Sequence, residues 1–265
     1  MTSTTALHTL TTRHAAFADR KLGLDLTRGK PNSEQLALSE SLDGILDGDF
    51  HDAHGTDLRN YGGTVAGIAE LGSWLMDVPP ANVLAGGNAS LELMWHVVSL
   101  LHQFGIDGPE SAWRHRAAPR ILCPVPGYDR HFALTERMGI EMVPVPMTDD
   151  GPDMDVVEEL VATDPDVVGM WCVPKYSNPT GVVFSADVVD RIARLGRRAG
   201  PHFRVLWDNA YAVHDLTDRP PVLSPIWQAC MRHDTLDSII HFASTSKITL
   251  AGGGVAFVGA SAANL

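Results

Sequence analysis

Four short polar segments of the sequence contain residue types that could do chemistry, and each follows an apolar run. Residues 86–90 (Gly-Gly-Asn-Ala-Ser) lead into a helical pattern, where backbone N–H groups and the helix dipole favour an anion such as phosphate. Asn178 precedes a proline that enforces a turn, and Asp208 ends an apolar run, where its carboxylate needs a cation. Lys247 follows a further apolar run among hydroxyl side chains, and desolvation there would make its amine a nucleophile toward carbonyl groups.

The elements that must position these segments are strands and helices in alternation. From about Val83 onward, short apolar runs alternate with helical periodicity, which predicts an α/β sheet of mainly parallel strands. We expect seven strands, at residues 83–85, 120–125, 142–147, 167–173, 205–208, 239–243 and 255–258. Apolar residues at three-to-four spacing predict helices after Asn88 and from Val188 to Leu195. Because the carboxyl ends of parallel strands meet at one edge of a sheet, the four segments should gather there.

Each segment also has an interpretation without chemistry. A glycine turn capped by Asn or Ser starts many helices that bind nothing, Asn-Pro is a common turn, and a structural Arg or Lys could pair with Asp208. Taken together, the four supply a phosphate cradle, an oxygen-side donor, a carboxylate for a protonated ring nitrogen and a reactive amine. This combination indicates a site for pyridoxal 5'-phosphate (PLP).

Composition and charge exclude several classes of protein. The 265 residues are 45% hydrophobic and 20% charged, which is typical of a folded globular chain. With 20 Lys and Arg against 32 Asp and Glu, the net charge is −12, so we expect no nucleic-acid partner. The three cysteines form no C-x-x-C pair and no apolar run reaches the roughly 18 residues of a membrane span, so we expect a cytoplasmic protein without a membrane partner. His51 and His54 lack a third ligand in a defined pattern, and we expect no metal site.

Seven motifs, in order along the chain, are similar to those of one enzyme family. They are residues 25–31 (Asp-Leu-Thr-Arg-Gly-Lys-Pro), 60–63 (Asn-Tyr-Gly-Gly), 87–90 (Gly-Asn-Ala-Ser), 126–128 (Pro-Gly-Tyr), 177–181 (Ser-Asn-Pro-Thr-Gly), 208–211 (Asp-Asn-Ala-Tyr) and 244–247 (Ser-Thr-Ser-Lys). The chain resembles the fold type I PLP-dependent aminotransferases, and among them the bacterial aspartate aminotransferase branch. The resemblance implies a homodimer, with PLP held on a sheet that is sandwiched between helices. It also implies transfer of an amino group between an amino acid, aspartate in that branch, and a 2-oxo acid.

The resemblance further implies a role for each motif residue around the PLP ring. Lys247 would form the Schiff base with PLP and move a proton at the Cα of the amino acid. Asp208 would keep the ring nitrogen protonated. Tyr211 and Asn178 would hydrogen-bond the ring oxygen, and Tyr128 would stack on the ring.

The phosphate and the substrate have implied contacts of their own. The residues that line up with the phosphate cradle are Asn88, Ala89, Ser90 and Ser244. Tyr61 lines up with a residue that reaches the phosphate of the neighbouring subunit. Gly29 falls where the arm of the family approaches the substrate carboxylate, and Asn178 is expected to face the substrate as well.

Two features depart from the family pattern. Many aminotransferases grip the phosphate with an arginine eight positions after the lysine, whereas that position here is Val255. The sequence ends at Leu265, where the family continues into a C-terminal small domain. We therefore expect residues 1–45 to be a helix (9–21) and an extended arm (24–31) that belong with a small domain, residues 46–265 to be the PLP-binding large domain, and turnover to be weak.

Two alternatives remain open. One is a different PLP chemistry on the same residues, such as a lyase or a decarboxylase. The other is a truncated, catalytically weak PLP-binding module. A Rossmann nucleotide-binding sheet is disfavoured, because neither G-x-G-x-x-G nor G-x-x-x-x-G-K-[ST] occurs.

Overall fold

The computed structural model describes residues 3–23, 31–61, 65–211 and 213–265. The chain forms two compact units, residues 1–38 and residues 39–265. The expected boundary near residue 45, with a small domain before it and a large domain after it, stays a prediction.

The first unit contains two helices, α1 (Ser3–Asp19) and α2 (Ser33–Ala37). Helix α1 begins six residues before the predicted helix, and the hydroxyls of Thr9, Thr11 and Thr12 donate to carbonyls four residues earlier in it. Helix α2 begins with a capping box, in which Asn32 and Gln35 each accept from the backbone N–H of the other. Residues 24–30, most of the expected extended arm, lie outside the described residues.

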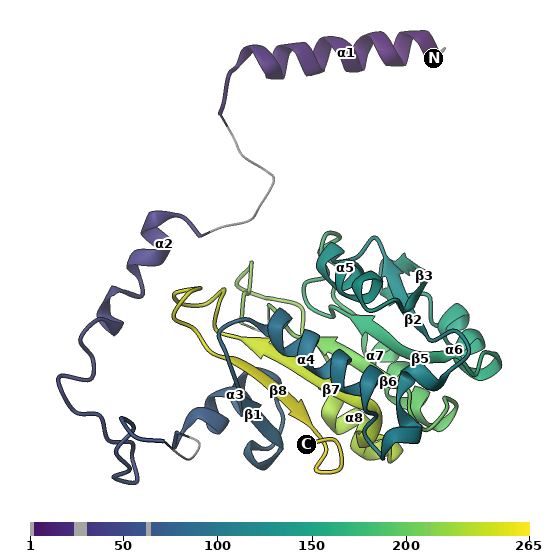
Figure 1. The fold of residues 1–265 in the computed structure, drawn as a ribbon. Coiled ribbons are helices and arrows are strands. Elements are labelled where there is room, and N and C mark those ends of the chain that lie inside the picture. Colours follow the sequence, from purple (N-terminus) through teal and green to yellow (C-terminus); the bar gives the residue numbers. More distant parts are fainter. Residues whose placement is uncertain (1–2, 24–30, 62–64, 212) are drawn as a thin grey trace. The chain divides into compact units, whose positions relative to one another are not determined.

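The second unit is built on one mostly parallel sheet (Figure 1). Its strands are β1 (Val83–Ala85), β2 (Arg120–Val125), β3 (Glu141–Thr148), β4 (Gly151–Pro152), β5 (Val167–Cys172), β6 (Arg204–Asp208), β7 (Ile239–Ser244) and β8 (Ala256–Ala260). Their order in the sheet is β1-β8-β7-β6-β5-β2-β3-β4. The pairs β3·β2, β2·β5, β5·β6 and β6·β7 are parallel, whereas β1·β8, β7·β8 and β3·β4 are antiparallel. The predicted α/β class is therefore confirmed.

The prediction of seven strands is wrong by one. The described part of the sheet has eight strands, and the additional one is β4. This strand has two residues and pairs with β3 through Met147–Pro152 and Thr148–Gly151. A two-residue strand that contains Gly and Pro has no hydrophobic period, so sequence patterning could not indicate it.

Helices cover both faces of the sheet (Figure 1). They are α3 (Ile68–Met76), α4 (Ser90–Gln103), α5 (Asp129–Arg137), α6 (Met154–Thr163), α7 (Ala186–Arg194) and α8 (Ile226–His233), with short 3₁₀ helices at Glu40–Leu42, Pro80–Asn82, Pro109–Ser111, Trp113–His115, Leu195–Arg197 and Leu236–Ser238. One core packs α3, α6, α7 and α8 against the sheet, and the other packs α4 and α5. Adjacent strand residues such as Leu206 and Trp207 belong to opposite cores, as expected for a strand buried on both faces.

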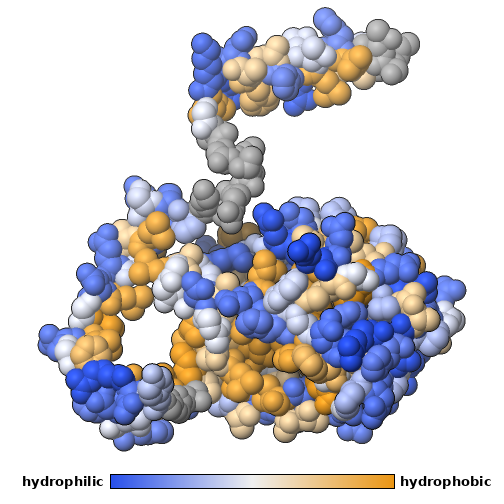
Figure 2. Space-filling view, viewed as in Figure 1, coloured by the Kyte–Doolittle hydropathy of each residue, from blue (hydrophilic) through white to orange (hydrophobic). Residues whose placement is uncertain are grey.

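Apolar side chains are also exposed on the second unit. Leu71 and Trp74 of α3 and Leu84 of β1 are accessible to solvent. Figure 2 shows hydrophobic residues gathered where Figure 1 places α3 and β1. We call these three residues the α3–β1 surface. Among the described residues, no helix is long and apolar enough to cross a membrane.

His241 of β7 is a buried polar residue inside the core. It is 2% exposed and lies 6.0 Å from the Trp207 ring, centroid to centroid. Neither of its ring nitrogens has a hydrogen-bond partner among the described residues. Burial lowers the pKa of His241 to about 3, because the apolar surroundings disfavour the charged ring.

The burial of His241 predicts an acid-sensitive fold. Between about pH 6.5 and about pH 3, the unfolded chain binds a proton at this residue that the folded chain does not bind. Stability should therefore fall with decreasing pH in this window, by up to about 1.4 kcal/mol per pH unit from His241. Urea unfolding of wild type and His241→Phe at several pH values measures the effect. Equal slopes for the two proteins would contradict it.

Candidate active site

Asp208, at the carboxyl end of β6, is the centre of the candidate site. Asp208 is 3% exposed. Strand β6 lies between β5 and β7 and is parallel to both. The Oδ2 atom accepts a hydrogen bond from Nε2 of His131 at 3.1 Å. The Oδ1 atom is buried and has no hydrogen-bond partner among the described residues. A buried carboxylate oxygen without a donor is costly, so the site is chemically incomplete without a further N–H or O–H group.

His131 is a site residue that the sequence did not reveal. It lies in α5 and is 1% exposed, with its ring stacked on Trp171 at 4.2 Å and edge-on to Tyr128 at 5.0 Å. The Trp171 indole donates to Thr135 Oγ1 at 2.9 Å, and that hydroxyl donates to the His131 carbonyl at 2.8 Å. These contacts fix the ring that holds Asp208. One feature of the sequence could have indicated this residue. His131 lies three positions after Tyr128, in the segment that follows the apolar run 120–125.

Two tyrosines, Tyr128 and Tyr211, are close enough to Asp208 to be affected by its negative charge. Burial raises the pKa of both Tyr128 and Tyr211, and the nearby Asp208 carboxylate raises each further. A hydrogen bond with the Asn178 side chain acts in the opposite direction on the pKa of Tyr211. The structure therefore brings together Tyr128, Asn178, Asp208 and Tyr211, as the motifs predict. A small cavity beside them is lined in part by Tyr128, His131 and Asn178.

Lys247 joins this group through Tyr211. Its Nζ lies 4.7 Å from the centroid of the Tyr211 ring, a cation–π geometry. Nε2 of His214 donates to the Lys247 carbonyl, with 2.8 Å between the two atoms. The side chain of Lys247 is exposed, so the expected desolvation of its amine is wrong. The reason is its place three residues beyond the end of β7, outside the sheet.

The glycine turn before α4 is tied to the loop that carries Lys247. The backbone bonds Gly86 N–Ala256 O and Ala256 N–Gly87 O, of 2.9 and 3.1 Å, join the turn to the first residue of β8, directly after that loop. Asn88 Nδ2 donates to the Gly252 carbonyl at 3.1 Å, and the Ser246 hydroxyl donates to the Asn88 carbonyl. The Asn88 side chain thus holds the loop together, which adds a structural role to its predicted role as a phosphate contact.

The start of α4 offers the features of an anion site. Gly87 adopts a positive φ of 58°, and the helix begins at Ser90 after the N-cap residue Ala89, which provides no side-chain cap. Uncapped N–H groups at a helix start favour a phosphate. Ser244 ends β7 and is buried. These positions agree with an anion cradle, although the phosphate contacts of Asn88, Ala89, Ser90 and Ser244 stay predictions.

Val255 has a clear structural role in place of the family's arginine. Its side chain packs against the core that contains α3 and α8. Its backbone N–H donates to Thr245 Oγ1 at 3.0 Å, and its carbonyl accepts from Thr245 N at 2.9 Å. A guanidinium at this position would replace an apolar core contact, so phosphate binding must use other groups.

Tyr61 is a predicted site residue that the structure does not bring to this group. Tyr61 is fully exposed and touches none of the other candidates within the described residues. Gly29 lies outside the described residues.

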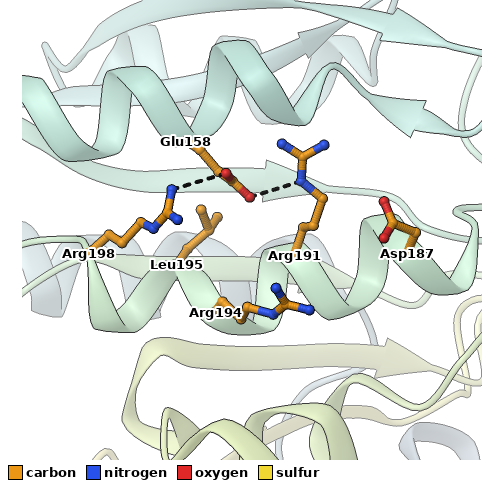
Figure 3. Close-up of a pocket in the computed structure, with 6 residues that line it drawn as sticks. All are labelled: Glu158, Asp187, Arg191, Arg194, Leu195 and Arg198. Atoms are coloured by element: carbon orange, nitrogen blue, oxygen red, sulfur yellow. Dashed lines mark hydrogen bonds and ion pairs between the residues drawn. The ribbon is translucent and has the colours of Figure 1, made fainter.

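A larger cavity of about 250 Å³ lies between α6 and α7, away from every candidate residue. Figure 3 shows Glu158 of α6 facing Arg191 and Arg198, to which it is bonded at 2.9 and 3.1 Å. Arg191 also pairs with Asp155, and Arg194 with Asp190. Each arginine that lines this cavity is paired with a carboxylate, so the cavity is a structural ion-pair network that links two helices. In the described residues, no group of three His, Cys, Asp or Glu side chains could hold a metal ion.

Comparison with known proteins decides the family. The sequence profile of the aspartate amino-transferase family matches residues 2–265. The chain belongs to the aspartate aminotransferase family. A member from Corynebacterium glutamicum, named aspartate aminotransferase, is 49% identical over 248 residues, which are 92% of this chain and 57% of that protein. A protein of Mycolicibacterium smegmatis is 50% identical over 270 residues, which cover 98% of this chain and 62% of the relative.

The family's fold is found in solved structures as well. A structure from Corynebacterium diphtheriae superposes with a TM-score of 0.89 at 44% identity, covering 97% of this chain and 64% of that one. The resemblance drawn from the seven motifs is therefore confirmed for family and fold. The chain spans 57% to 64% of the length of these three relatives.

Proposed function

We propose that the protein binds PLP and transfers an amino group between an amino acid and a 2-oxo acid. One observation carries this proposal, the buried Oδ1 of Asp208 that lacks a donor while Oδ2 is held by His131. The protonated ring nitrogen of PLP is a donor of the required charge. Bound there, PLP would supply a carbonyl group that condenses with amines and a ring that accepts electrons.

The surrounding residues fit the rest of that molecule. The Asn178 side chain lies near enough to Tyr211 to lower its pKa, so both polar groups are placed where they could hydrogen-bond a ring oxygen. Tyr128 stands edge-on to His131 and can cover a ring face. The phosphate would lie at the start of α4, with Ser90 and its neighbours Asn88 and Ala89 on one side and Ser244 on the other.

Lys247 is the residue that would act on the substrate. Its exposed amine can meet a carbonyl or a substrate from solvent, and the Tyr211 ring orients it at 4.7 Å. When it is not bonded to PLP, the amine would move a proton from the substrate Cα to the C4′ carbon of PLP. The Tyr211 face stabilises the protonated amine that results.

Aspartate is the amino donor we propose, with a 2-oxo acid as acceptor. The support is the 49% identical relative from Corynebacterium glutamicum, which is named aspartate aminotransferase. Another PLP chemistry, such as elimination or decarboxylation, would use the same residues around the ring. The products formed from aspartate distinguish these reactions.

A homodimer is the proposed assembly. Tyr61 is an aromatic residue that is fully exposed in the single chain, and the α3–β1 surface leaves Leu71, Trp74 and Leu84 accessible. Exposed aromatic and aliphatic groups of this kind mark interfaces between chains. We propose that Tyr61 crosses to the phosphate of the partner subunit. We also propose that Gly29 and Asn178 contact the substrate carboxylate.

A cytoplasmic location is proposed from the cysteines. Cys123, Cys172 and Cys230 are all buried and free. Burial raises the pKa of the Cys123 thiol to about 12 and that of Cys230 to about 11, which keeps both in the unreactive thiol form. Free thiols of this kind suit a reducing compartment.

A stoichiometric experiment tests the proposal without relying on repeated turnover. PLP added to the protein should give a visible absorbance band, and borohydride should then fix PLP to one of only four lysines, Lys21, Lys30, Lys175 and Lys247. Peptide mass mapping should find the label on Lys247. Aspartate should remove the band and yield pyridoxamine phosphate and oxaloacetate in equal amounts. Labelling elsewhere, or carbon dioxide as the product, would contradict the proposal.

A further inference from the structure

Lys175 is a buried charged residue that the proposed reaction does not use. It lies in the loop after β5 and is 8% exposed. Its Nζ donates to Asp215 Oδ1 at 2.8 Å, and the Asp215 side chain is about half exposed. A nearly buried lysine is rare unless it is paired, because the ammonium loses its hydration. The pair therefore holds the loop after β5 and the loop after β6 together at a definite point.

Both loops carry site residues close to this pair. Asn178 follows Lys175 by three positions, and Tyr211 precedes Asp215 by four. The Asn178 side chain is near enough to lower the pKa of Tyr211. The ion pair thus joins the two loops within four residues of each of the side chains that are assigned to the ring oxygen.

The residue next to Asp215 extends this connection to Lys247. His214 stands edge-on to the Tyr211 ring at 5.7 Å and bonds the Lys247 carbonyl at 2.8 Å. A carbonyl only accepts, so His214 Nε2 carries the proton in this contact. The two neighbours His214 and Asp215 therefore connect the Lys247 main chain to the loop of Asn178.

We propose that Lys175 is a positioning residue, which through its ion pair with Asp215 fixes Tyr211 and His214, and through them Lys247. Its part in catalysis rests on the proposed function, whereas the connection itself rests on the contacts in the chain. Lys247 is exposed and lies beyond the sheet, so packing in the sheet does not hold it in place. The connection through Lys175 and Asp215 would supply this positioning.

The variants that test the proposal are Lys175→Met and Asp215→Asn, with Lys175→Arg as the conservative change that keeps the pair. Asp155→Asn is the matched control, because it breaks an ion pair with Arg191 at a distant surface. The first readout is hydrogen exchange of the peptide 209–222 in the protein without PLP. Exchange should become roughly tenfold faster in Lys175→Met and Asp215→Asn only.

The second readout is the pH midpoint of the visible band in the PLP-loaded protein. Asn178 and Tyr211 favour the deprotonated chromophore, so their displacement should raise the midpoint by about 0.5 to 1 pH unit. The double variant Lys175→Met/Asp215→Asn should shift it no further than either single variant, and Lys175→Arg should restore it. Asp215→Asn should cost more thermal stability than Lys175→Met, because it leaves a buried ammonium unpaired.

The outcomes separate the two proposals. An unchanged midpoint in Lys175→Met and Asp215→Asn overturns the positioning role, even if exchange becomes faster, since that pattern describes a merely structural pair. If the wild-type protein shows no band with PLP, the proposed function fails. The exchange of peptide 209–222 then decides alone whether Lys175 fixes this loop.

Discussion

Replacing Lys247 with alanine should abolish the visible PLP band and slow the reaction with aspartate by about 10³-fold or more. The amine is the one cationic group that contacts Tyr211 in the described residues, at 4.7 Å from its ring centroid. Without it, no group at this point can condense with the PLP carbonyl or take the proton from Cα. Absorbance spectra and single-turnover product analysis measure the two effects.

The matched control for Lys247→Ala is Lys21→Ala, which removes an exposed lysine from the first unit. It should leave the band, the borohydride label and the half-reaction unchanged. Because Lys247 is exposed and lies beyond β7, its removal should change the melting temperature by less than a few degrees. A band that persists in Lys247→Ala would show that another lysine carries the cofactor, and would refute the assignment.

Replacing Asp208 with asparagine should change binding and stability in opposite directions. The side chain would lose its negative charge, so PLP affinity should fall by about 10- to 100-fold. The rate constant of the half-reaction with aspartate should fall by a further factor of about 10². In the protein without PLP, the same change removes a buried charge whose one bond is to His131. Stability there should stay equal or rise by about 1 kcal/mol or more.

PLP titration by fluorescence and urea unfolding without PLP check this pair of effects. Asp129→Asn is the control, because Asp129 is exposed in the first turn of α5, close to Tyr128, and carries the same charge. It should leave PLP affinity within about twofold. A loss of affinity as large as that of Asp208→Asn would mean that general electrostatics, and no direct contact, governs binding.

The sequence was sufficient for the parts of the site that lie at strand ends. Asp208 closes an apolar run, and the run itself predicts the strand, so its place at the sheet edge follows from the parallel order. Asn178 was predicted by the same reasoning, whereas Tyr128 and Tyr211 were predicted from the resemblance of their motifs to those of the family. The structure places all four together.

The partners that complete the site could not be read from the sequence. His131 and Asp208 are 77 residues apart, and Lys175 and Asp215 are 40 apart. Such pairs depend on how neighbouring strands are ordered and on loop conformation, which hydrophobic periodicity does not contain. The exposure of Lys247 was mispredicted for a related reason, because the chain leaves the sheet after Ser244 and the strand pattern says nothing about the turn that follows.

The glycine turn before α4 has a consequence for the order in which the protein is made. Its bonds to the loop of Lys247 span 158 and 164 residues, so they form only after the chain has been synthesised as far as residue 252. Closing such a long loop is slow and entropically costly until the intervening strands are in place. On the ribosome, the strands β2, β3 and β5 can pair early, but the cofactor cradle must wait for β8. A nascent chain therefore completes the proposed PLP site only after β8 has been synthesised.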